Sequence, residues 1–435
     1  MTDQNIETGL GAAPRQDHDW ASPAFKANLA RRRRKETGLR LLGLSAIGLA
    51  FLMLGILLWT LISGGTQAFR QTHVTLDVPV LAELVDPADP SRGNYRAVIQ
   101  QAMATTFPDA PEDRLRALSG IVSNSAQFVV RDRVVSDPSL VGQVVQIRVP
   151  VADTYDQLMK GNVNEASDES MRRLSDADIA AFRELQAQGR ISTPLNWALI
   201  GNSDSRFPEL AGLKGAIIGS FYALLVCFLI SFPLGIGAAI YLEEFAPKNR
   251  ISDIIEVNIN NLAAVPSVVF GLLGLAVFLN YLGMPRSAPF VGGLVLALMT
   301  LPTIIIATRA ALKAVPPSIR EAALGVGASK QQVVFGHVLP LAMPGILTGT
   351  IIGLAQALGE TAPLLLIGMN AFVTAAPATP FDASTALPTQ IFIWADSPER
   401  GFVSRTSAAI LVLLGFLVLM NAIAIYLRNK FERRW

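Results

Sequence analysis

One short segment of the chain combines small residues, a glycine and a proline at a spacing suited to contact with another protein. Its residues of interest are, in order, Glu321, Ala322, Ala323, Gly327, Leu339 and Pro340. Small side chains let a second protein approach a short helix and its turn closely, and glycine adopts backbone angles that other residues resist. We therefore expect a docking helix near 318–326, with its alanine face buried by the partner and Glu321 paired with a basic residue at the partner's rim.

A second candidate is the carboxylate of Glu360, which is flanked by long uncharged runs. A charge inside a membrane is costly, and such residues are usually paired and often functional. We interpret Glu360 as the partner of a cation, either Arg309 or a side chain of a second subunit, that sets a gate or positions a positive charge. Contact with water at the membrane face is the alternative interpretation.

The residues around Glu360 favour a break in the helix. Gly359 can end one helix, and Thr361 can cap the next one, with Pro363 in its first turn, where a missing amide proton is tolerated. The amide groups at such a helix start would face an anion. Asn261, in a cluster of asparagines at the start of another apolar segment, is a further candidate for a translocation path; hydrogen bonding between helices is the alternative.

The elements that must position these residues belong in a membrane. Of the 435 residues, 51% are apolar and 16% are charged, a balance that soluble domains of this size do not normally have. About 20 apolar residues cross the hydrocarbon layer, which is roughly 30 Å thick. The sequence predicts an α-helical multi-pass membrane protein with six transmembrane helices, at 41–63, 215–242, 257–282, 288–308, 343–367 and 406–427.

Clusters of arginine and lysine flank the predicted spans. They lie at 31–40 before the first span, at 309–320 after the fourth and at 428–434 after the sixth. Short cationic flanks stay in the cytoplasm, so six spans would place both termini there. We interpret the arginine run as this topological signal rather than as a nucleic-acid site, and residues 1–38 as a disordered basic cytoplasmic arm.

Residues 64–212, between the first two spans, have a different composition, with 19 acidic and 14 basic side chains. The runs at 126–130 and 144–151 resemble strands, and those at 94–103 and 176–188 resemble helices. We predict a periplasmic α+β domain here. The chain then divides into the arm at 1–38, a first transmembrane helix at 39–63, the insert at 64–212, a five-helix core at 213–427 with a cytoplasmic loop at 309–345, and a tail at 428–435.

The chain lacks the groups that most catalytic chemistry needs. No Gly-x-x-x-x-Gly-Lys-Ser/Thr run is present, so ATP hydrolysis would need a partner protein. The one cysteine, Cys227, lies in a predicted span and provides no disulfide framework, and the three histidines are scattered. We expect neither a catalytic site nor a cofactor or metal site.

The segment 321–340 resembles the EAA loop of binding-protein-dependent ABC importer permeases, whose fold is of the MetI-like type. The pattern is Glu-Ala-Ala, three residues, Gly, nine residues, an aliphatic residue, one residue and Leu-Pro, and His337 stands here at the aliphatic position. The resemblance implies that the loop docks an ATPase. Gly359–Leu366 is similar to the fifth-span signature of PstA-type permeases of phosphate-specific importers, and the similarity as a whole covers residues 213–427.

The resemblance implies a subunit of an ATP-driven importer that moves inorganic phosphate across the inner membrane. Its implied partners are a related PstC-type permease, a dimer of PstB-type ATP-binding subunits and a periplasmic PstS-type phosphate-binding protein. An importer for another oxyanion or small solute is one alternative. A membrane-anchored sensor that uses residues 64–212 as its ligand domain is another, although a sensor needs no complete EAA loop.

Overall fold

The computed structural model describes residues 23–108 and 111–431. The chain forms two compact units, Met1–Thr60 and Leu61–Trp435. Each is described by itself.

The first unit consists, in its described part, of most of helix α1, Pro23–Thr66, which has 44 residues. Its apolar side chains, among them Phe51 and Trp59, are exposed. The helix includes residues 23–38, so this part of the predicted disordered arm is instead helical, in keeping with its content of the good helix formers Ala, Leu, Lys and Arg. Residues 1–22 of the predicted arm lie outside the described residues.

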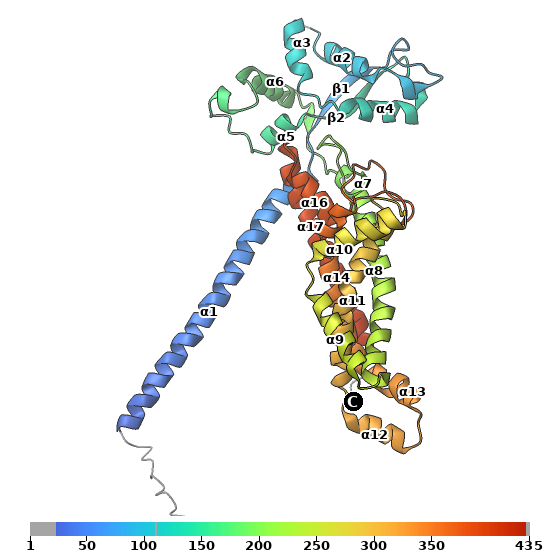
Figure 1. Cartoon of the computed structure of the whole chain (residues 1–435). Helices are drawn as coiled ribbons and strands as arrows, with labels where there is room; N and C mark the ends of the chain where they lie inside the picture. The colour runs from blue at the N-terminus through green and yellow to red at the C-terminus, as the bar shows by residue number, and fades with distance from the viewer. Residues whose placement is uncertain (1–22, 109–110, 432–435) are drawn as a thin grey trace, which may run out of the picture. The chain divides into compact units, whose positions relative to one another are not determined.

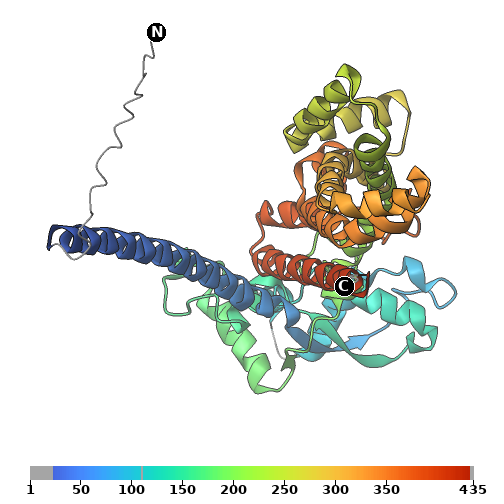
Figure 2. The same cartoon turned by 90° about the horizontal axis from the view of Figure 1, so that it is seen from below.

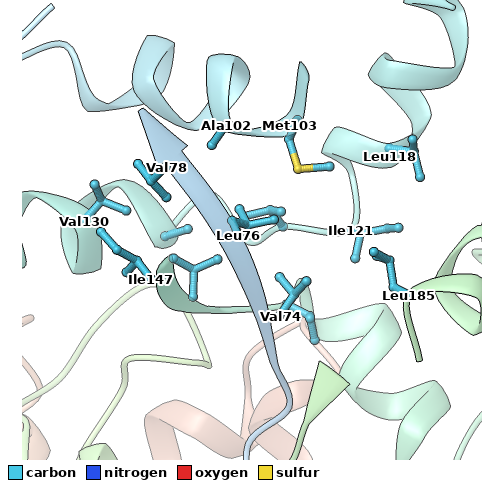
Figure 3. Close-up of a cluster of buried hydrophobic side chains, with 14 of the residues drawn as sticks. Val74, Leu76, Val78, Ala102, Met103, Leu118, Ile121, Val130, Ile147 and Leu185 are labelled. Carbon is cyan, nitrogen blue, oxygen red and sulfur yellow. The ribbon is translucent and has the colours of Figure 1, made fainter. Parts of the chain in front are cut away.

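The second unit begins with the inserted domain, residues 64–212, which contains a three-stranded antiparallel sheet in the order β2-β1-β3. The strands are β1 His73–Pro79, β2 Val144–Pro150 and β3 Ile191–Ser192. Val74, Leu76 and Val78 of β1 are buried, because alternate side chains of a strand point to the same face. Figure 3 shows these side chains among others from the surrounding helices, such as Met103 and Leu185.

Helices pack around this sheet, and buried residues of α2 to α6 share its core. The helices of the inserted domain are η1 Gln67–Phe69, η2 Pro90–Arg92, α2 Tyr95–Thr106, α3 Glu112–Ser119, α4 Ala126–Ser136, η3 Pro138–Leu140, α5 Asp153–Met159, η4 Glu169–Met171, α6 Asp176–Ala187 and α7 Ala198–Gly201. The expected helices at 94–103 and 176–188 and the strand at 144–151 are present. The expected strand at 126–130 is wrong, because its apolar residues continue at a spacing of four: Ala126, Val130 and Val134 are the buried face of α4.

The membrane part of the second unit is a bundle of long helices. They are α8 Lys214–Ile240, α11 Pro289–Lys313, α14 Leu339–Gly359 and α17 Gly401–Phe431. In sequence order, α8 packs on α11, α11 on α14 and α14 on α17, as Figure 1 shows from the side and Figure 2 from the α12 end. Glycines permit this closeness: a Cβ atom at Gly349 would collide with Ala307, and one at Gly293 with Val226.

The span predicted at 257–282 is not one straight helix. The segment forms α9 Arg250–Ala263, followed by α10 Ser267–Leu273 and the π-helical η6 Gly274–Tyr281, and the two parts meet at an angle of 102°. Pro266 lies at the bend, and proline disfavours helical angles in the residue before it. In the described part of the chain, five helices are long and apolar enough to cross a membrane, or up to six if this bent pair is one span.

The fifth predicted span, 343–367, is also interrupted. Helix α14 ends at Gly359, and a separate short helix, α15 Ala362–Leu366, follows the break at Glu360 and Thr361. The remaining elements of the membrane part connect the long helices: the π-helical η5 Tyr241–Phe245, α12 Pro317–Gly325, α13 Lys330–Val333, the π-helical η7 Val334–Val338 and α16 Leu387–Ala395.

Candidate functional site

The docking segment predicted from sequence forms a helix, a turn and a second helix at one end of the bundle. Helix α12 ends at Gly325, and Gly327 turns the chain with a φ of +89°, which a residue without a side chain adopts at little cost. Ser329 then begins α13 with a reciprocal capping box to Gln332, which satisfies amide donors at the helix start. The predicted helix at 318–326 is therefore present, with a fixed turn behind it.

The two alanines of the docking segment differ in burial. Ala323 is buried in the chain's own core with Val333, Val334 and Val338. Glu321 and Ala322 are exposed. The expectation that a partner buries the alanine face is therefore wrong for Ala323, which attaches α12 to its own bundle, and stays a prediction for Ala322.

Large apolar side chains surround the exposed part of the segment. Leu324, Val326 and Phe335 are exposed, Val326 to 87%. Glu321 forms no ion pair within the described residues, so its carboxylate is available on the same surface. We call Glu321, Ala322, Leu324, Val326 and Phe335 the docking surface.

The last two residues of the docking pattern lie behind this surface. Leu339 and Pro340 form the first turn of α14 and are half-buried. His337, at the position where an aliphatic residue was expected, is exposed in η7, and its exposure explains how a polar side chain is accommodated there.

The partly buried side chain of Arg320 joins the docking segment to the bundle. Arg320 pairs with Glu244 at 2.8 Å and also donates to the carbonyl oxygens of Leu312 and Val315, at 2.9 and 2.7 Å. These contacts join α12 to η5 and to the end of α11. A displacement of α12 would therefore be passed to the ends of two long helices.

Arg309 lies in the same region and not beside Glu360. Its guanidinium group pairs with Glu256 of α9 at 2.8 Å and with Glu243 of η5 at 3.4 Å. Lys313 also approaches Glu243, at 3.6 Å. Sequence reasoning missed Glu243 and Glu256 as partners of Arg309. Glu243 and its neighbour Glu244 directly follow a long apolar helix, at the kind of position where other spans have cationic flanks.

The predicted pairing of Glu360 with Arg309 is wrong. Gly349 of α14 packs on Ala307 of α11, two residues before Arg309. Glu360 lies eleven residues beyond Gly349, a rise of about 16 Å along a helix. The alternative partner, a cation of a second subunit, stays a prediction.

The break at Glu360 has the predicted place but not the predicted cap. Helix α15 begins after Thr361 with Pro363 in its first turn, and the Thr361 side chain makes no capping hydrogen bond. Glu360 and Thr361 are half-buried, whereas Asn261 is exposed on α9. The structure therefore does not gather Glu360, Thr361, Arg309 and Asn261 into one site.

A second polar cluster, which sequence reasoning missed, joins the inserted domain to α17. Arg405 is 3% exposed and donates to the carbonyl oxygen of Ala211 at 2.6 Å and to Gln71 Oε1 at 3.1 Å. One turn earlier, the backbone N–H of Gly401 donates to Asp153 at 3.0 Å. A lone arginine at the edge of an apolar run was the available signal.

Acidic groups balance the charge of Arg405 from nearby. Asp156 pairs with Lys160 at 2.5 Å and accepts from the backbone and hydroxyl of Thr72. Glu209 is 6% exposed, and burial raises its pKa to about 7 against a hydrogen bond from Ser123 and the attraction of Arg405. We call Arg405, Asp153, Asp156, Lys160 and Glu209 the junction cluster. Within the described residues, no group of three or more His, Cys, Asp or Glu is arranged to hold a metal ion.

Comparison with known families matches the two parts of the chain separately. Residues 231–435 match the family described as "Binding-protein-dependent transport system inner membrane component". Residues 26–169 match a "Domain of unknown function (DUF3333)".

Individual relatives agree with the first match. The chain is 34% identical over 214 residues to the phosphate transport system permease protein PstA of Yersinia pestis, covering 49% of this chain and 71% of that one. It is also 34% identical over 172 residues to the probable ABC transporter permease protein YqgI of Bacillus subtilis, covering 39% of this chain and 58% of that one. The match thus spans somewhat more than half the length of YqgI.

Proposed function

The chain belongs to the binding-protein-dependent ABC transporter permeases, and we propose that it is the subunit of an importer that carries inorganic phosphate across the inner membrane. The observation that carries this proposal is the 34% identity to a phosphate permease over 214 residues. The sequence from Gly359 to Leu366, which resembles a signature of such permeases, coincides with the helix break at Glu360. YqgI, whose name states no substrate, keeps another oxyanion or small solute as the second candidate.

The proposed importer contains further subunits. A second, PstC-type permease would complete the path, a dimer of PstB-type subunits would hydrolyse ATP, and a PstS-type protein would deliver phosphate from the periplasm. In this arrangement the docking surface contacts the ATPase. Exposed apolar side chains around Glu321 support this role, because an exposed apolar patch with a polar rim commonly marks a protein contact.

The proposed coupling runs from the docking surface into the bundle. Ala323 is packed into the core, and Arg320 is bonded to Glu244, to the carbonyl group of Leu312 in α11 and to that of Val315 just after it. A movement of the ATPase would therefore displace the ends of α8, α11 and α14 together. ATP hydrolysis itself needs the partner, since this chain has no phosphate-binding loop.

The proposed topology places both termini and the docking surface in the cytoplasm and the inserted domain in the periplasm. It requires that the bent pair α9–α10 crosses the membrane once. To test this topology, a cysteine is introduced at Ser167 or at Ser329, and intact cells are treated with a membrane-impermeant thiol reagent. Label at 167 and not at 329 is expected, and label at both positions would contradict the topology.

The substrate is tested by uptake in a bacterial strain that lacks its own phosphate importers and receives this chain with its related permease, ATPase and binding protein. We expect ATP-dependent uptake of radiolabelled phosphate that excess sulfate or molybdate does not suppress. Strong suppression by either anion, or uptake of a different solute only, would replace phosphate with the second candidate.

A further inference from the structure

A cationic pocket lies between the inserted domain and the residues just before α17, apart from the proposed membrane path. The pocket has a volume of about 290 Å³ and lies where α5, the loop at 162–174 and Arg400 meet. Three arginines line it, Arg172, Arg173 and Arg400, together with one carboxylate, Asp153. The planar set of N–H donors on arginine matches the geometry of phosphate and carboxylate groups.

The innermost arginine has an unused donor. The Arg172 side chain is 6% exposed. One terminal nitrogen donates to the carbonyl oxygen of Glu165 at 2.9 Å, and the other pairs with Asp176. Its Nε atom is buried without a hydrogen-bond partner. An unpaired buried donor is costly, so the described residues leave the hydrogen-bonding capacity of Arg172 incomplete.

The other two arginines are charged groups without a committed partner. Arg173 and Arg400 are exposed and form no ion pair within 4.0 Å in the described part of the chain. Glu399 is close enough to Arg173 to be influenced by its charge but does not line the pocket. Two positive charges therefore face the pocket without a carboxylate bound to them.

The single carboxylate of the pocket is already engaged. Asp153 Oδ1 accepts from Gln157 Nε2 at 3.2 Å, and Oδ2 accepts from the backbone N–H of Gly401 at 3.0 Å. Neutral donors add to the lining: the Nδ2 amide of Asn164 makes no hydrogen bond to a described residue. The pocket thus offers more donors and positive charge than its own acceptors satisfy.

We propose that this pocket binds a phosphate-type oxyanion between Arg172, Arg173 and Arg400. The anion is either free phosphate or the headgroup of a lipid, because Arg400 immediately precedes the membrane-spanning helix α17. The inference depends on the charges of this pocket and not on the substrate proposed for the importer.

The test measures equilibrium binding of radiolabelled inorganic phosphate to the full chain in dodecyl maltoside, a detergent that contains no phosphate. The double variant Arg173→Gln/Arg400→Gln removes both exposed charges and no ion pair of the fold. We expect binding to weaken about tenfold or more, because the variant removes two charged hydrogen-bond donors from the anion. Arg92→Gln, which removes an arginine on an 89% exposed side chain elsewhere in the domain, should bind as the parent does.

A second variant guards against misfolding as the cause of lost binding. Asp153→Asn removes the negative charge of the pocket and keeps one of its two acceptor oxygens. We expect tighter phosphate binding, by about threefold or more, because a like charge near the anion is gone. A misfolded protein would not gain affinity.

A parallel sample distinguishes the two sources of the anion. The chain is incubated with phosphatidylglycerol, and retained lipid is counted by mass spectrometry. If the double variant binds phosphate more weakly than the parent, the ligand is a free oxyanion. If the double variant no longer retains phosphatidylglycerol, the ligand is a lipid headgroup. Binding of neither ligand, or binding unchanged in the double variant, overturns the proposal. Because the isolated chain is used, this result is independent of phosphate uptake by the assembled importer.

Discussion

The two ends of the bundle hold their arginines in different ways. Next to the docking surface, Arg309 and Arg320 pair with carboxylates from other elements and stay partly exposed. At the inserted domain, Arg405 is almost fully buried and donates to a carbonyl and an amide oxygen. Its countercharges, which include Glu209, lie nearby without an ion pair to it within 4.0 Å.

This difference indicates which end can move. Partly exposed ion pairs contribute little and can exchange partners at low cost, which suits a segment that transmits motion from a partner. Moving α17 away from the inserted domain would break the hydrogen bonds of Arg405 to the Ala211 carbonyl and to Gln71, and would leave buried polar groups unpaired. The junction cluster therefore fixes the inserted domain to the first turns of α17, whereas the opposite end is adjustable.

The largest expected effect is at the junction cluster. Arg405→Met removes two hydrogen bonds and leaves nearby acidic groups uncompensated, so the free energy of unfolding should fall by about 3 to 5 kcal/mol. This free energy is measured by urea denaturation in detergent, and the protease resistance of the inserted domain reports the folded fraction. Arg92→Met is the matched control, because that arginine is exposed. A loss below about 1 kcal/mol for Arg405→Met would mean that the junction is no more rigid than the other end.

The junction cluster should also make stability depend on pH. Burial raises the pKa of Glu209 from 4.5 to about 7, so the folded chain holds this proton more tightly than the unfolded chain. Its protonated form is favoured on folding, and stability should fall as pH rises from about 4.5 through about 7. The free energy of unfolding should therefore be lower above pH 7 than below pH 4.5 by roughly 3 kcal/mol.

Glu209→Gln is expected to remove that part of the pH dependence, because the amide does not titrate. Unfolding free energies at pH 5, 6, 7 and 8 for the parent and the variant provide the comparison. Equal slopes for the two proteins would show that another group causes the pH dependence.

A smaller effect is expected at the docking end. A double-mutant cycle on Arg320→Gln and Glu244→Gln should give a coupling energy of about 1 kcal/mol, since the pair is only partly buried. The cycle is measured by urea denaturation of the isolated chain. A coupling as large as the loss at Arg405 would remove the contrast between the two ends.

The smallest effect on stability is expected at Glu360. Because Glu360 is half-buried and has no ion pair within the described residues, Glu360→Gln should change the unfolding free energy by about 1 kcal/mol or less. If a cation of the second permease subunit pairs with it, phosphate uptake by the assembled importer should still fall. Unchanged uptake over a range of phosphate concentrations would support simple contact with water.

Local patterns allowed part of this structure to be predicted. The helix at 317–325, the turn at Gly327 and the break after Gly359 follow from glycine, proline and capping residues within a few positions of each other. Long-range partners were not predictable in the same way. The carboxylates that pair with Arg309 come from two other elements, and sequence distance carries no information about that contact.

The elements that differ from simple straight spans and strands have equally physical causes. The predicted span at 257–282 is divided at Pro266, where its two parts meet at an angle of 102°, because proline disfavours helical angles in the residue before it. The run at 126–130 is too short to separate a strand from a helix, and only its continuation to Val134 reveals the spacing of four. The junction cluster was missed because Arg405 follows two other charged residues at the start of an apolar run, where an arginine is expected to face water, and its partners Gln71 and Ala211 are distant in sequence.

The central claim, that the docking surface drives phosphate import, is tested most directly by uptake of radiolabelled phosphate into proteoliposomes that contain the assembled importer and internal ATP. Glu321→Lys reverses a charge on the docking surface, and Glu83→Lys reverses an exposed charge on the inserted domain. The account predicts normal uptake for Glu83→Lys, and for Glu321→Lys normal membrane insertion with uptake abolished. Normal phosphate uptake by the Glu321→Lys importer would contradict it.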